Sequence, residues 1–495
     1  MKLSKLLEKL DYTIIQGDDS TEVSTLTSDS RKVQEGTAFV SIVGAVSDGH
    51  KFIPAVVRDG ASVVVVQKGS EYETVKDDVT VVEVENTRLA LALMSAAYFG
   101  YPAEKLYTIG ITGTKGKTTT TYMIRNVLEA CGIKTGLIGT IETIIGEESV
   151  HANNTTPESY IIHETFAKMV SAGCKAVVME VSSQGLKLDR TAGIMFDIGV
   201  FTNLSPDHIG PNEHADFEEY KVCKAMLFKQ CKVGIVNADD SHTADVIKDA
   251  TCKIEKYGMT SEADIKAQDI ELYHENGRIG IKFDCTGLVE MPVELEMPGK
   301  FSVYNSLCAI AVTRHFNVEK EVLLKSLLNV KVKGRIEIVK VSDRFTLMID
   351  YAHNAMALES VLGTLKEYEP NRLVCMFGCG GNRARDRRFE MGEVSGRVAD
   401  FTVITSDNPR FEEPLAIIED IKTGISKTDG EYVIVPDRRE AIKYVIKTGQ
   451  PGDIVILAGK GHEDYQEIKG VKYPMDERVI IAEVLAELKS EGWMG

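Results

Sequence analysis

Residues 109–121 read IGITGTKGKTTTT, and this stretch decides the fold of the middle of the chain. An apolar strand is predicted over residues 106–111, a tight turn over residues 113–118 and a helix over residues 119–130. Glycines in the turn allow backbone N–H groups to close on phosphate oxygens, and the N-terminus of the following helix adds favourable dipole charge. Strand, turn and helix in this order predict a site for the phosphates of a nucleotide.

The turn is a shortened phosphate-binding motif, GxxGKT, because the longer template would place glycine at Ile111. Lys117 is placed to reach the β- and γ-phosphates of ATP, and the hydroxyl of Thr118 is placed to bind Mg²⁺. An ordinary strand-to-helix turn with a capping threonine is the alternative interpretation. We favour ATP binding, and the residues expected to contact ATP in this turn are Gly113, Thr114, Lys115, Gly116, Lys117, Thr118 and Thr119.

Composition excludes several classes of partner. Lysine and arginine total 57 against 74 aspartates and glutamates, so the formal net charge is −17, which disfavours nucleic acid and anionic membranes as partners. No apolar run approaches the roughly 18 residues that a membrane span needs, and charges break the N-terminal leucine pattern, which predicts an amphipathic first helix. The nine cysteines show no CxxC spacing and are typical of reduced thiols in a cytoplasmic protein.

Short apolar runs alternate with helical segments along most of the chain, which predicts an α/β protein built on parallel, doubly wound sheets. Length and punctuation divide it into three domains: a small N-terminal α/β domain (1–101), a central phosphate-loop domain (102–333) and a C-terminal Rossmann-like domain (334–495). Strands are predicted at 176–180, 198–202 and 233–237 in the second domain and at 346–351, 372–377, 401–405 and 453–457 in the third. Helices in the third are predicted at 357–368, 392–399, 415–423 and 437–447.

Polar residues follow several predicted strands, where ligands of parallel sheets gather. Glu180 and His208 are candidate metal ligands, although a helix N-terminal carboxylate and a structural histidine are the simpler interpretations. Asp350 ends a strand of the third domain. The stretch GCGGNR at 378–383, with further arginines at 385, 387 and 388, favours carboxylate or phosphate recognition over a solvated basic face.

Collinear motifs then identify a resemblance that covers essentially the whole chain. They are DSR at 29–31, GTKGKTTT at 113–120, NTTP at 154–157, EVSSQGL at 180–186, TNLSPDH at 202–208, EEYKVCKAMLF at 218–228, YNSLCAIA at 304–311, GRIE at 334–337, DYAH at 350–353, GCGG at 378–381, SDNPR at 406–410 and AGKGHEDYQ at 458–466. The chain resembles the ATP-dependent Mur ligases, and most closely those that add the third residue of the bacterial cell-wall stem peptide.

The resemblance implies a reaction. ATP phosphorylates the γ-carboxylate of D-glutamate in UDP-N-acetylmuramoyl-L-Ala-D-Glu, and an amino acid, here meso-diaminopimelate, attacks the acyl phosphate. It implies Lys117, Glu180, His208 and Lys224 as catalytic residues. It also implies Mg²⁺ held by Thr118, Glu180, His208 and Lys224, the last as a carbamate formed with CO₂. A monomeric, cytoplasmic bacterial enzyme in peptidoglycan synthesis is expected.

Binding residues are carried over from the same motifs. Further ATP contacts are Asn305, Arg335 and Asp350. The UDP-N-acetylmuramoyl dipeptide is expected at Ser30, Asn154, Thr155, Thr156, Ser182 and Arg190. Diaminopimelate is expected at Arg383, Asp407, Asn408, Arg410, Gly459 and Glu463, with Arg410 and Asn408 on its extra carboxylate and Glu463 on its distal ammonium.

Alternatives remain open within and beyond this reaction. GCGGNRARDRR and DYAHNA depart from the family pattern near the amine site, so L-lysine or another diamino acid is the alternative substrate. A kinase would release ADP without free phosphate, and a catalytically silent ATP-binding regulator is a third class. Folylpolyglutamate-synthetase-like chemistry uses similar loops, but DNPR and GKGHE argue against it.

Overall fold

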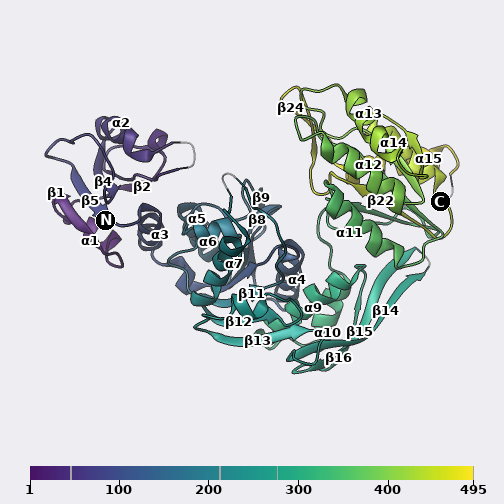
Figure 1. Cartoon of the computed structure of the whole chain (residues 1–495). Coiled ribbons are helices and arrows are strands. Elements are labelled where there is room, and N and C mark those ends of the chain that lie inside the picture. Colours follow the sequence, from purple (N-terminus) through teal and green to yellow (C-terminus); the bar gives the residue numbers. More distant parts are fainter. Residues whose placement is uncertain (45–46, 211–212, 276, 494–495) are drawn as a thin grey trace. The chain divides into compact units, whose positions relative to one another are not determined.

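The computed structural model describes residues 1–44, 47–210, 213–275 and 277–493. It is a mixed α/β structure with several largely parallel sheets, which confirms the predicted fold class (Figure 1). Two compact units are present, one formed by residues 1–264 and 308–319 and the other by residues 265–307 and 320–495. The predicted domain borders after residues 101 and 333 stay a prediction.

The N-terminal sheet has the strand order β1-β5-β4-β3-β2, and only the β1–β5 pair is antiparallel. Its elements are α1 (Leu3–Leu6), β1 (Thr13–Gln16), β2 (Thr25–Thr27), β3 (Thr37–Val40), α2 (Ile53–Arg58), β4 (Ala61–Gln67), β5 (Thr80–Val84) and α3 (Thr87–Tyr98). The valine run of β4 is buried on both faces, as parallel strands between helices require. The predicted amphipathic first helix is present as the single turn α1, which buries Leu3 and Leu6, and residues 13–16 form β1, which pairs with β5.

The central sheet of the first unit places β6 between β10 and β11, in the order β13-β12-β11-β6-β10-β7-β8-β9. Its strands are β6 (Tyr107–Thr112), β7 (Thr135–Ile138), β8 (Glu142–Ile145), β9 (Glu148–His151), β10 (Ala176–Glu180), β11 (Phe196–Phe201), β12 (Cys231–Asn237) and β13 (Lys253–Gly258). Its helices are α4 (Lys117–Ala130), α5 (Ser159–Ser171), α6 (Ser183–Lys187), α7 (Phe217–Ala225) and α8 (Thr243–Val246). Because β6, β10 and β11 are parallel neighbours, the loops after their carboxyl ends meet.

The second unit contains an antiparallel ribbon and a six-stranded sheet with the order β17-β18-β22-β19-β20-β21. The ribbon is β14 (Ile265–Glu275), β15 (Arg278–Gly287) and β16 (Met291–Leu295), followed by α9 (Lys300–Thr313) and α10 (Lys320–Leu328). The sheet strands are β17 (Glu337–Val339), β18 (Thr346–Asp350), β19 (Arg372–Phe377), β20 (Phe401–Ile404), β21 (Glu431–Ile434) and β22 (Asp453–Ala458). A hairpin of β23 (Tyr465–Ile468) and β24 (Val471–Pro474) follows β22.

Helices cover both faces of that sheet. They are α11 (Ala355–Lys366), α12 (Asp386–Val398), α13 (Pro414–Ile425), α14 (Arg438–Thr448) and α15 (Glu477–Ser490). In β19, Cys375 and Phe377 pack into the core with α11–α13, whereas Val374 and Met376 pack into the core with α14 and α15. This period-two alternation is what a central strand with two buried faces produces. No helix among the described residues is both long and apolar enough to span a bilayer.

Candidate active site

The phosphate loop lies at the carboxyl end of β6, where the sequence predicts it. Gly113 and Gly116 have φ values of +145° and +86°, a region in which side-chain-bearing residues are strained. Helix α4 begins at Lys117. The Lys117 ammonium donates to the carbonyls of Gly113 (2.8 Å) and Thr114 (3.0 Å), so it lies folded over the loop that would hold the phosphates.

The residues after β11 fasten this loop. Asn203 accepts from the Lys115 N–H at 2.9 Å, and its side-chain amide donates to the Lys115 carbonyl at 3.0 Å. Its own carbonyl accepts from the Thr114 N–H at 2.8 Å. The Thr202 hydroxyl donates to the Lys115 carbonyl at 2.7 Å. These bonds fix the backbone before a ligand arrives, which is the preorganisation that a phosphate site needs.

Thr118 and Glu180 meet directly, as the metal prediction requires of these two residues. The Thr118 hydroxyl donates to Glu180 Oε1 at 2.9 Å, and the carboxylate also accepts from the N–H and hydroxyl of Thr140 at 2.8 and 3.1 Å. Both side chains are buried. A hydroxyl and a carboxylate are hard oxygen donors, and Mg²⁺ binds through one or two carboxylates together with waters and phosphates. The pair therefore fits a Mg²⁺–ATP complex.

Lys224, on α7, reaches the same loop. Its side chain is buried, and its amine donates to the Gly113 carbonyl at 2.9 Å, the carbonyl that also accepts from Lys117. The amine lies 4.5 Å from the ring centroid of Tyr220, whose hydroxyl is 3.1 Å from that of Thr114. Burial, together with the neighbouring Lys117 charge, holds the pKa of Lys224 well below its usual value.

His208 is in a different environment from Thr118 and Glu180. Its ring is about half exposed, and its Nδ1 lies 3.1 Å from Glu213 Oε1. Among the described residues, no group of three or more His, Cys, Asp and Glu side chains could hold a metal ion. Of the four metal ligands predicted from the sequence, Thr118 and Glu180 are in direct contact. Lys224 contacts the same phosphate loop through the Gly113 carbonyl, and His208 contacts Glu213 instead.

Sequence reasoning missed His214. It is fully buried, its Nε2 lies 2.9 Å from the Ser183 hydroxyl, and burial lowers its pKa. Its ring centroid lies 5.2 Å from that of Tyr220, so it joins α6 to the helix that carries Lys224. In the sequence, the position of His214 two residues before Asp216, which caps the N-terminus of α7, could have indicated that its side chain lies close to this helix.

Most of the central-sheet residues expected to bind the UDP-sugar dipeptide are linked by hydrogen bonds next to Glu180. Thr156 donates to the Glu180 carbonyl at 3.0 Å and accepts from the Ser182 N–H at 2.9 Å. Arg190 donates to the Thr156 carbonyl at 2.9 Å, and the Thr155 and Thr140 hydroxyls are 3.0 Å apart. Asn154 is exposed beside them, and Ser30 begins a short 3₁₀ helix, Ser30–Lys32, between β2 and β3.

In the second unit, Asp350 and Arg335 lie close together in space, because Asp350 binds the backbone of Ile336, the residue after Arg335. Asp350 is buried at the end of β18, and its carboxylate accepts from the N–H groups of Ile336 (2.9 Å) and Ala352 (2.8 Å). Burial raises its pKa, against the lowering effect of Arg335 and those two hydrogen bonds. The Arg335 guanidinium lies 5.2 Å from the Tyr351 ring centroid. Asn305, the third predicted contact, lies on α9.

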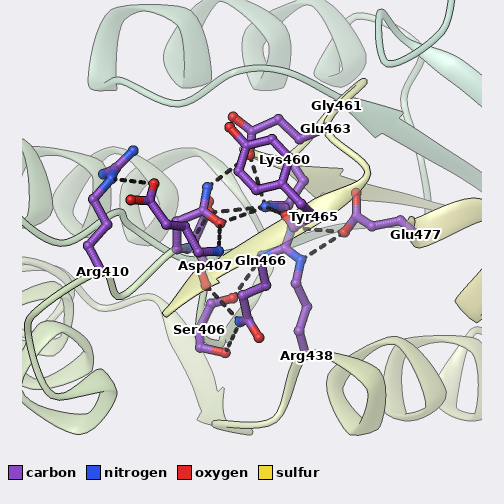
Figure 2. A network of polar contacts seen from close by, with 12 residues as sticks. Ser406, Asp407, Arg410, Arg438, Lys460, Gly461, Glu463, Tyr465, Gln466 and Glu477 are labelled. Carbon is purple, nitrogen blue, oxygen red and sulfur yellow. Dashed lines mark hydrogen bonds and ion pairs between the residues drawn. The ribbon is translucent and has the colours of Figure 1, made fainter. Parts of the chain in front are cut away.

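Five of the six predicted amine-binding residues lie on the loops after β20 and β22, part of which Figure 2 shows: Asp407, Asn408, Arg410, Gly459 and Glu463. Asn408 donates to Glu463 at 2.9 Å, and a Cβ atom on Gly459 would lie 3.1 Å from the Asp407 carboxylate. Arg410 pairs with Glu467 at 3.1 Å and donates to the Gly381 carbonyl at 2.8 Å. Arg383, the sixth predicted residue, is exposed on the loop between β19 and α12. Lys460, which the sequence analysis did not single out, lies at the centre of these contacts.

Two arginines of the cluster that follows GCGG, Arg385 and Arg388, form ion pairs within the protein, whereas Arg383 is exposed. Arg388 is buried and binds Asp420 (2.9 Å) and Glu412 (2.7 Å), and Arg385 also pairs with Asp420. The pairs with Asp420 hold α12 to α13, and Arg388 is buried between its two carboxylate partners, so we expect no ligand at Arg388. The glycines serve close packing, since a Cβ on Gly381 would lie 1.9 Å from the Pro409 carbonyl.

Comparison with known proteins agrees with this arrangement. Three family models match: "Mur ligase family, catalytic domain" over 22–99, "Mur ligase middle domain" over 111–313 and "Mur ligase, glutamate ligase domain" over 334–461. A protein of Clostridium perfringens named UDP-N-acetylmuramoyl-L-alanyl-D-glutamate--2,6-diaminopimelate ligase is 41% identical, covering 98% of this chain and 99% of its own. A protein of Caldanaerobacter subterraneus with the same name is 42% identical, covering 98% and 99%.

Solved structures extend the likeness to three dimensions. One described as a UDP-N-acetylmuramoyl-L-alanyl-D-glutamate--2,6-diaminopimelate ligase superposes with a TM-score of 0.72 at 29% identity, covering 99% of both chains. A MurF ligase of Thermotoga maritima, solved in complex with ADP, superposes with a TM-score of 0.55 at 18% identity, covering 95% of this chain and 97% of its own. At that identity the second likeness concerns the fold alone.

Proposed function

The chain belongs to the Mur ligase family of ATP-dependent ligases, and from that premise we propose that it joins meso-diaminopimelate to the D-Glu γ-carboxylate of UDP-N-acetylmuramoyl-L-Ala-D-Glu. The observation that carries the proposal is the loop at Gly113, whose carbonyl accepts from both Lys117 and Lys224 beside the Thr118–Glu180 pair. Full-length relatives named for this reaction support the choice of substrates.

A carboxylate does not react with an amine in water, so the reaction needs an activated acyl group. Transfer of the ATP γ-phosphoryl group to the carboxylate gives an acyl phosphate, and attack by the amine then releases phosphate. Lys117 would leave its loop carbonyls to bind the phosphates, and Thr118 and Glu180 would hold Mg²⁺ with His208. When bound, Mg²⁺ neutralises phosphate charge.

Lys224 would contribute as a carbamate. A neutral amine is the form that attacks CO₂, and burial beside Lys117 favours this neutral form. Addition of the neutral amine to CO₂, with loss of one proton, gives an anionic oxygen donor, whereas the ammonium form of the lysine would repel a cation. The Gly113 carbonyl and the Tyr220 ring orient the side chain for this step.

The remaining predicted contacts divide by substrate. Asn305, Arg335 and Asp350 would complete the ATP site. Ser30, Asn154, Thr155, Thr156, Ser182 and Arg190 would bind the UDP-sugar dipeptide, and Arg383, Asp407, Asn408, Arg410, Gly459 and Glu463 the diamino acid. We further propose a monomer in the cytoplasm, which size-exclusion chromatography and cell fractionation would test.

Phosphate release tests the proposal. Purified protein would receive ATP, Mg²⁺ and the UDP-sugar dipeptide with meso-diaminopimelate, with L-lysine or with no amine. Release that requires diaminopimelate is expected. Release with L-lysine alone would keep the ligase chemistry and replace the amine, ADP formation without phosphate would indicate a kinase, and no turnover would indicate a regulator.

A further inference from the structure

Lys460 is a fully buried cation inside the proposed amine site. Its exposed fraction is 0%, and its ammonium donates to Asn408 Oδ1 at 3.0 Å, to Glu463 Oε2 at 2.9 Å and to the Tyr465 carbonyl. Three acceptors match the three N–H bonds of an ammonium group, so the side chain is charged and fully engaged. A buried charge with complete hydrogen bonding is costly to remove and fixes its partners.

These bonds determine which way the Asn408 amide points. Its Oδ1 also accepts from the Glu467 N–H at 2.8 Å, and neither Lys460 nor a backbone N–H can accept a hydrogen bond. The amide nitrogen must therefore face Glu463, to which it donates at 2.9 Å. The hydrogen bonds that the described residues make to the Glu463 carboxylate all fall on Oε2, which leaves Oε1 for a ligand ammonium.

The guanidinium expected to bind the second carboxylate of the diamino acid is already paired. Arg410 contacts Glu467 at 3.1 Å, and Asp407 Oδ1 lies 3.8 Å from the Lys460 ammonium. The ion-paired groups thus comprise three carboxylates (Asp407, Glu463 and Glu467) and two cations (Lys460 and Arg410). Figure 2 shows Arg438 and Glu477 in the same network, where they pair with each other at 2.8 Å, so that their charges offset.

We propose that Lys460 is a positioning residue that sets amine specificity: it orients Asn408 and Glu463 and keeps the site neutral enough to accept a zwitterionic distal end. This inference rests on the proposed function. The distal end of meso-diaminopimelate carries an ammonium and a carboxylate, whereas that of L-lysine carries an ammonium alone. Removing the Lys460 charge makes the site more negative, which repels the extra carboxylate and favours lysine.

The test is the ratio of kcat/KM for meso-diaminopimelate to that for L-lysine. In Lys460→Met this ratio should fall by about tenfold or more, because a unit charge is lost from a buried network in contact with Glu463. In Glu467→Gln it should rise, since this change removes a negative charge and releases Arg410 for the substrate carboxylate. The second variant decides the matter if Lys460→Met does not fold.

Lys472→Met is the matched control. Lys472 is exposed on β24, and its amine lies 3.9 Å from the ring centroid of Tyr465, the residue whose carbonyl Lys460 binds. The same charge is removed at the surface, where salt screens it, so the ratio should change less than about twofold. Equal losses with both amines in Lys460→Met and an unchanged ratio in Glu467→Gln would overturn this inference alone. A wild-type enzyme that uses neither amine would overturn it together with the proposed function.

Discussion

Replacing Gly113 by alanine tests the geometry of the phosphate loop most directly. Gly113 has a φ of +145°, and a Cβ atom on it would lie 1.9 Å from the Thr202 hydroxyl oxygen. That oxygen cannot simply turn away, because it donates to the Lys115 carbonyl at 2.7 Å and Thr202 is 3% exposed. Alanine at this position therefore meets both a backbone penalty and a collision.

The two contributions can be separated. A non-glycine residue at such a φ costs about 1–3 kcal/mol, and an overpacked contact costs about 1–3 kcal/mol more, so Gly113→Ala should destabilise the first unit by about 2–6 kcal/mol. Thr202→Ala alone loses a hydrogen bond worth about 1 kcal/mol. In the Thr202→Ala background the collision at 1.9 Å is absent, so Gly113→Ala should cost less there: the backbone contribution and the 3.1 Å contacts with the Asn203 backbone remain.

Urea unfolding followed by two probes measures this cycle. The one tryptophan, Trp493, packs in the second unit, so its fluorescence reports that unit, whereas far-UV circular dichroism reports both. The transition of the first unit should shift while the fluorescence transition stays fixed. Equal costs of Gly113→Ala in the two backgrounds, or a cost below about 1 kcal/mol, would refute the assignment of the collision to Thr202.

Three further predictions concern single side chains. Lys117→Met should abolish phosphate release while circular dichroism stays native; residual turnover above about a tenth would remove Lys117 from the mechanism. Lys224→Ala should be inactive and regain part of its phosphate release with a short carboxylate such as acetate, and absence of rescue would count against the carbamate. Burial lowers the pKa of His163 to about 4, below the unfolded value of 6.5, so the unfolded state binds the extra proton and stability should fall by about 3 kcal/mol between pH 6.5 and 4. Urea unfolding of His163→Leu across that pH range should lack this loss.

Local patterns predicted most of the sheets, because strand periodicity and turn chemistry are encoded in neighbouring residues. The predicted strand at 176–180 has the same bounds as β10, and the loop between β6 and α4 lies where GTKGKT places it. Helix α12 begins at Asp386, six residues before the predicted start at 392. Its first turn is rich in charged residues, which favours a loop in the sequence pattern, yet Arg388 is buried there by partners 24 and 32 residues away.

Motifs along the chain identify the family, the phosphate loop and the carboxylate and lysine beside it, because the chemistry of each motif depends on spacing between neighbouring residues. Tertiary structure alone decided which charges remain available to a ligand. Arg410 pairs with Glu467 across 57 residues, and Lys460 binds Asn408 across 52. These residues meet because parallel strands bring loops that are distant in sequence to one edge of a sheet. A buried charge without a partner costs free energy, so each side chain there must be paired.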